Sequence, residues 1–142
     1  MRPVDAPRVR LSGWHQALVF TVLAALLATG IIWLVFQFIT APELMGAHPA
    51  QVWSLRVHGG LAMVMGVVAG TLMPRHVATA WRLRRNRLSG SAMLALLLLL
   101  AVTGWLLYYA GPEWRDAASW AHWVIGLVLP VALAVHWLQR KR

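Results

Sequence analysis

The sequence predicts an all-α fold, an integral membrane four-helix bundle whose successive helices run up, down, up and down. Hydrophobic residues make up 60% of the 142 residues, more than a soluble domain of this length carries. Four stretches supply the roughly 20 apolar residues that a helix needs to cross the hydrocarbon core. They lie at about 14–39, 52–73, 88–110 and 118–138. The connections are short, so we expect residues 1–142 to form one bundle surrounded by membrane lipid.

The basic residues support this topology. Of the 13 Lys and Arg residues, all but Arg56 and Arg115 lie before the first helix, between the second and third, or after the fourth. An up-down bundle brings these three segments to one side of the membrane, and Lys and Arg mark the cytoplasmic side. We therefore expect both ends of the chain in the cytoplasm. The net charge of +9 is then a membrane signal, and we expect no nucleic acid partner.

The first helix follows a basic segment, as the apolar core of a signal peptide also does. Residues 25–28 would serve as a cleavage context. The apolar run nevertheless continues to Phe36, beyond the length of a typical signal core. We expect an uncleaved helix that carries His15 near its cytoplasmic end.

The second helix carries His58 near its outer end, and we expect it to end or kink at Pro74. Small residues recur along it, at Gly59, Gly60, Gly66 and Gly70. Glycines let membrane helices pack closely, and they also make room for a flat cofactor. The sequence favours neither explanation over the other.

The third helix contains a leucine run at 94–100, interrupted only by Ala95, and no histidine. Such a run has little amphipathic pattern. We expect this helix to face lipid over much of its surface.

The fourth helix carries two histidines, His122 near its outer end and His136 near its inner end. Fourteen residues separate them, which leaves the two within roughly 40° of one face and about 21 Å apart along the axis. Pro130 lies between them, and proline is a common cause of helix kinks, so the angle applies to a straight helix.

The histidines carry the candidate chemistry, because the four apolar stretches hold no Asp, Glu or Lys. Ionisable residues at membrane depth are costly and usually functional. Matched depths pair His15 with His136 and His58 with His122. Two pairs of imidazoles in an apolar bundle suit two b-type haems with both axial positions filled, and electron transfer is then the natural task.

Two alternatives remain for the inner site. His76 lies eighteen residues from His58 and competes with His15 as the partner of His136. A zinc or copper site would need three or four ligands at one depth, and only His15, His76 and His136 approach that. Arg56 and Arg115 are candidates to hold haem propionates on the outer side.

The pattern resembles the bacterial cytochrome b561 family of four-helix di-haem inner-membrane proteins. The residues that carry the resemblance are the histidines in Trp14-His15-Gln16, Arg56-Val57-His58-Gly59-Gly60, Trp120-Ala121-His122 and Val135-His136-Trp137. The resemblance implies haem ligation by His15 with His136 and by His58 with His122, a bacterial inner-membrane location, and electron exchange with quinone. The outer loops are brief, which puts in doubt any substrate pocket built by them.

Three functions follow from this interpretation. The first is a di-haem b subunit that passes electrons between the quinone pool and a periplasmic or membrane redox partner. The second is a free-standing quinone reductase of the superoxide-oxidase type. The third is a haem-free membrane anchor or accessory subunit.

Overall fold

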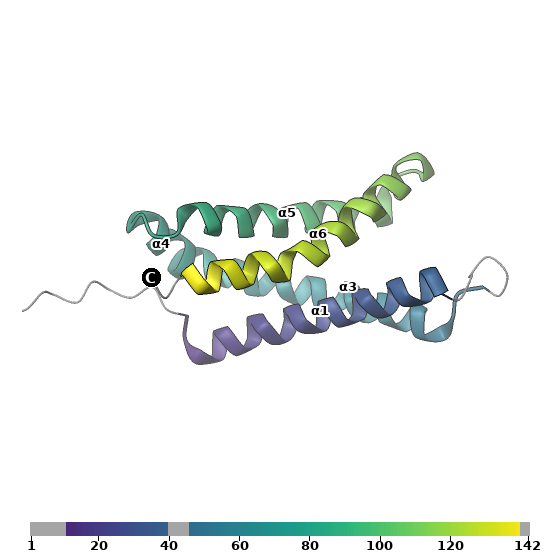
Figure 1. Cartoon of the computed structure of the whole chain (residues 1–142), viewed down its shortest axis with the longest axis horizontal. Coiled ribbons are helices and arrows are strands. Elements are labelled where there is room, and N and C mark those ends of the chain that lie inside the picture. Colours follow the sequence, from purple (N-terminus) through teal and green to yellow (C-terminus); the bar gives the residue numbers. More distant parts are fainter. Residues whose placement is uncertain (1–10, 40–45, 140–142) are drawn as a thin grey trace, which may run out of the picture.

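The structure, a computed structural model, describes residues 11–39 and 46–139 and is helical through most of that part of the chain. Four long helices alternate in direction along the bundle (Figure 1). They are α1 (Gly13–Ile39), α3 (Pro49–Leu72), α5 (Arg87–Tyr109) and α6 (Pro112–Gln139). Four helical segments, with α3 continued to Arg82, are long and apolar enough to cross a membrane. The chain is thus an all-α, multi-pass membrane protein, as predicted. The basic residues at 1–10 and 140–142 lie outside the described residues.

The four helices associate as two hairpins. Helix α1 packs along α3, and α5 packs along α6, while the contact between the hairpins is smaller and joins α1 to α6. No side chain in the described part of the chain is completely buried. Closely packed interiors are the rule in helix bundles. In this bundle, two cavities lie between the hairpins.

Proline and its neighbours define where two of the long helices begin. Pro49 is the first residue of α3, and the side chain of His48 before it accepts a hydrogen bond from the Ala50 amide at 3.1 Å. Pro112 opens α6, with Glu113 in the first turn, where an acidic side chain is favourable. Pro130 lies inside α6 without ending it.

At Pro74 the helix changes its hydrogen bonding but does not stop. Proline has no amide hydrogen, so the α-helical ladder is interrupted, and the five residues Met73–Val77 form a π-helical turn, η1. The Ala78 amide donates to the Met73 carbonyl, five residues back. Helix α4 (Ala78–Arg82) follows. The π turn carries His76.

Arg87 stabilises the turn between α4 and α5. Its Nε and Nη2 donate to the Trp81 carbonyl at 3.1 and 2.7 Å, and its guanidinium lies 5.1 Å from the centre of the Trp81 ring system. Arg84 and Asn86 in this turn have positive φ angles of 52° and 48°. The turn belongs to the arginine-rich end of the bundle, defined by Arg75, Arg82, Arg84, Arg85 and Arg87.

Candidate functional site

His58 and His122 face one another across the two hairpins. His58 comes from α3 and His122 from α6, and their ring centroids lie 6.1 Å apart with the ring planes at 70°. Both rings line the larger cavity, of about 1000 Å³, between the hairpins. This volume lies at the upper end of the range of ligand and cofactor sites.

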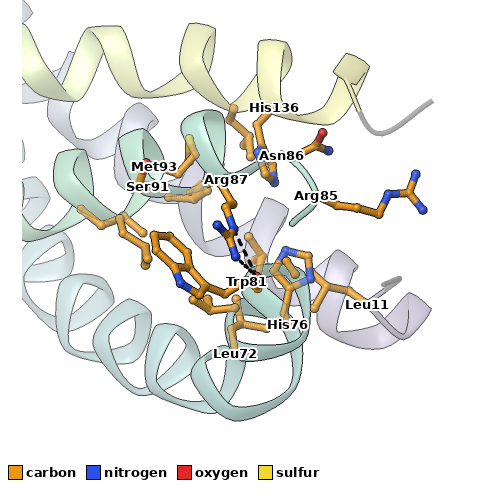
Figure 2. Close-up of a pocket in the computed structure, with 18 of the residues that line it drawn as sticks. Leu11, Leu72, His76, Trp81, Arg85, Asn86, Arg87, Ser91, Met93 and His136 are labelled. Atoms are coloured by element: carbon orange, nitrogen blue, oxygen red, sulfur yellow. Dashed lines mark hydrogen bonds between the residues drawn. The ribbon is translucent and has the colours of Figure 1, made fainter. Parts of the chain in front are cut away.

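A second pair of imidazoles lies toward the arginine-rich end. The rings of His76 and His136 have centroids 6.4 Å apart and planes at 78°. Both line the smaller cavity, of about 630 Å³, which His136 enters from α6 and His76 from the opposite side (Figure 2). Trp81 and Arg87 belong to the same lining.

The ring opposite His136 in this structure therefore belongs to His76, the alternative inner ligand. His15, which the sequence paired with His136, lies in the first turn of α1. Its Nδ1 is 2.6 Å from the Ser12 hydroxyl, and its ring centroid is 5.5 Å from that of Trp14. His76 reaches this position from the π turn Met73–Val77, where the helix departs from regular α-helical geometry.

The separation of the rings in each pair suits a shared metal ion. A bond of about 2.0 Å to each nitrogen, with the nitrogen about 1.1 Å from its ring centre, puts two opposed imidazole centroids roughly 6.2 Å apart. The two pairs lie at 6.1 and 6.4 Å. Among residues 11–39 and 46–139, no three His, Cys, Asp or Glu side chains gather where they could hold a metal ion. Two imidazoles facing one another are a donor set that suits a metal with further ligands of its own, such as haem iron.

The two cavities adjoin. Four apolar side chains line both of them, namely Leu23, Met65, Leu97 and Leu133. An apolar space of this kind matches the largely apolar porphyrin. His122 and His136 are fourteen positions apart, which corresponds to about 21 Å along α6.

Each of four histidines has a hydroxyl at Nδ1, and this feature was missed from the sequence. The hydroxyls of Thr29, Thr103 and Ser89 lie 2.9, 2.9 and 3.0 Å from the Nδ1 atoms of His58, His122 and His136. Ser12 bonds to His15 within one helical turn. These four hydroxyl residues are the only Ser or Thr residues followed directly by glycine in the sequence, at Ser12-Gly13, Thr29-Gly30, Ser89-Gly90 and Thr103-Gly104.

Spacing supplies the signal that would have found two of these partners. Ser89 and Thr103 are fourteen residues apart on α5, as are His122 and His136 on α6. In an antiparallel hairpin, equal spacings on the two helices place Thr103 level with His122 and Ser89 level with His136. The glycines that follow are close to the same rings, because a Cβ at Gly30, Gly104 or Gly90 would lie 3.6, 3.4 or 3.9 Å from the nearest Cε1 atom.

The two candidate propionate ligands differ in placement. Arg115, near the start of α6, lines the larger cavity together with Tyr108. The Arg56 guanidinium lies 5.2 Å from the centre of the Trp53 ring system on the exposed side of α3. Arg115 is therefore the better placed of the two to bind an anionic group in the cavity. The chain matches no known family model, no curated protein and no solved structure.

Proposed function

We propose that this chain is a membrane cytochrome that binds two b-type haems and carries electrons between the quinone pool and a redox partner on the periplasmic side. The observation that carries the proposal is the pair His58 and His122. Two helices from different hairpins present their imidazoles 6.1 Å apart in an apolar cavity of about 1000 Å³. That combination suits axial ligation of haem iron from both sides.

In the proposed site the protein binds, orients and shields the cofactor. When bound, haem supplies reversible one-electron chemistry at its iron. His58 and His122 would hold the haem iron between their two imidazoles, an arrangement that favours electron transfer. Arg115 supplies a cation for a propionate. Leu23, Met65 and the other apolar side chains of the lining keep water away.

The second site has His136 as its fixed ligand. Its partner is His76, which lies opposite it in the structure, or His15, which the family resemblance assigns. Either choice leaves the second site toward the arginine-rich end, about 21 Å along α6 from the first. Two redox centres at these depths would span much of a hydrocarbon core about 30 Å thick.

The proposed orientation follows from charge. The arginine-rich end would face the cytoplasm of a bacterial inner membrane, and the end with the 110–111 connection would face the periplasm. The partner would then dock near Arg115 and the outer haem. Quinone would exchange electrons at one of the two ends, where exposed tryptophans such as Trp53, Trp81 and Trp114 lie.

The test is an absorption spectrum of the full chain purified in detergent after expression with adequate haem. The proposal predicts the bands of haem b, with reduction when a quinol is added anaerobically. A protein without haem bands would contradict the proposal and would favour the haem-free anchor. Co-purification of a redox protein would support a subunit role.

A second candidate, the free-standing quinone reductase that accepts electrons from superoxide, draws on the position of Arg115. A cation beside the cavity would attract a small anion. Reduction of the haem by superoxide in the absence of any partner, lost in Arg115→Glu, would favour this function over the first.

A further inference from the structure

Threonine hydroxyls contact both histidines of the larger cavity at Nδ1. Thr103 is 8% exposed, and its Oγ1 lies 2.7 Å from the Leu99 carbonyl and 3.3 Å from that of Leu100. A carbonyl oxygen only accepts, and a threonine hydroxyl has one hydrogen. The hydroxyl hydrogen is therefore committed to the helix backbone.

The contact of Thr103 with His122 must then run in the other direction. The Thr103 oxygen is 2.9 Å from Nδ1 of His122, and with its hydrogen already donated it can only accept. Nδ1 of His122 accordingly carries the proton. In a neutral imidazole this leaves Nε2 unprotonated, with a lone pair for a metal ion.

His58, the facing histidine, has the same arrangement. Oγ1 of Thr29 lies 2.8 Å from the Ala25 carbonyl and 3.0 Å from that of Leu26, and 2.9 Å from Nδ1 of His58. The two hairpins thus share one arrangement. In each, a threonine hydroxyl donates to its own helix backbone and accepts a hydrogen bond from a histidine on the neighbouring helix.

His136 has a different hydroxyl partner, with no short bond to its own helix. The hydroxyl of its partner Ser89 lies 3.4 Å from the Asn86 carbonyl, a distance too long to fix where the hydrogen goes.

We infer that Thr29 and Thr103 are positioning residues, which hold His58 and His122 as Nδ1–H tautomers with Nε2 available for iron. An acceptor at Nδ1–H makes the imidazole a more basic ligand. A more basic ligand stabilises the oxidised iron and lowers its reduction potential. The statement about tautomers stands without haem, whereas the statement about the potential rests on the proposed function.

The tautomers are measured by ¹⁵N NMR of the histidine rings in the full chain, labelled and purified without haem. We expect a protonated Nδ1 and an unprotonated Nε2 in both His58 and His122. Thr103→Val keeps the size of the side chain but removes the hydroxyl acceptor and leaves the Leu100 carbonyl. The population of the Nδ1–H form of His122 should therefore fall in part toward the Nε2–H form, while His58 stays unchanged. Thr103→Ser should retain the original pattern.

Thr71→Val is the matched control. Thr71 makes the same kind of bond to its own helix, with Oγ1 2.7 Å from the Val68 carbonyl. Its substitution should leave both histidines as they are. An Nε2–H tautomer in the unsubstituted chain, or a Thr103→Val spectrum identical to it, would overturn the inference.

In the haem-loaded protein, Thr103→Val should raise the reduction potential of the haem held by His58 and His122. Loss of one such hydrogen bond is expected to change the ratio of reduced to oxidised haem roughly tenfold, or about 59 mV for one electron. An unchanged potential would overturn the electronic part. If the chain takes up no haem, the proposed function fails, and the NMR result still decides the tautomers.

Discussion

Gly104 and Gly90 offer a paired test of how closely the helices approach the histidine rings. A Cβ at Gly104 would lie 3.4 Å from Cε1 and 3.8 Å from Nδ1 of His122. Carbon atoms prefer about 3.5–4.0 Å, so in Gly104→Ala the new methyl group lies at the near edge of ordinary contact and the His122 ring must move by about 0.1 Å. A Cβ at Gly90 would lie 3.9 Å from Cε1 of His136, which is an ordinary contact.

The expected effect on cofactor affinity follows from these distances. Metal–ligand distances tolerate deviations of about 0.2 Å. The expected ring shift is smaller than this, so Gly104→Ala should weaken haem binding at His122 by about threefold, less than the roughly tenfold effect of a lost supporting contact. Gly90→Ala should change binding at His136 less than about twofold.

The assay is a titration of haem-free protein with haemin, followed by absorption. To read one site at a time, Gly104→Ala is measured in a His136→Ala background and Gly90→Ala in a His122→Ala background. Equal losses of affinity at the two sites would refute the reasoning, and so would a larger loss for Gly90→Ala.

The remaining predictions concern the ligands and their surroundings. If His76 holds the second haem with His136, His76→Ala should lower the haem content from two to one per chain while His15→Ala keeps both; the reverse result would assign His15. Arg115→Gln should lower the potential of the outer haem, because it removes a cation that favours the reduced iron, and Arg56→Gln should change it less; redox titration measures both. Arg87→Ala removes two hydrogen bonds to the carbonyl near the end of α4, so it should lower the free energy of unfolding by about 1–3 kcal/mol, measured in detergent, and an unchanged stability would contradict this role.

The sequence was sufficient for the helices and for their alternating directions. Hydropathy located all four long helices, and the absence of acidic residues and lysine from the apolar stretches left the histidines as candidate ligands. Depth along the helices placed His58 level with His122, and the structure puts their rings 6.1 Å apart. These conclusions needed only length, charge and the rise of an α-helix.

The surroundings of His76 could not be obtained in the same way. A regular helix puts it about 27 Å from His58, too far to match the spacing on α6. The π turn at Met73–Val77 breaks that regularity, and Pro74 alone did not specify whether the helix would end, kink or change its hydrogen bonding. Backbone irregularity of this kind depends on the tertiary structure around it.

The hydroxyl partners were missed for a different reason. A glycine in a membrane helix indicates close packing or room for a flat cofactor, and it gives no information about the residue before it. Thr29 and Thr103 are ordinary helix residues until α1 is placed beside α3 and α5 beside α6. Only then do their hydroxyls lie 2.9 Å from histidine nitrogens.

The central claim is that His58 and His122 bind one haem iron from both sides. Electron paramagnetic resonance of the oxidised full chain tests it most directly, in a His136→Ala background that leaves only this site. The account predicts a low-spin ferric signal, which is lost when either His58 or His122 is also replaced by alanine. A high-spin signal in the His136→Ala protein, or a low-spin signal that survives both further substitutions, would contradict it.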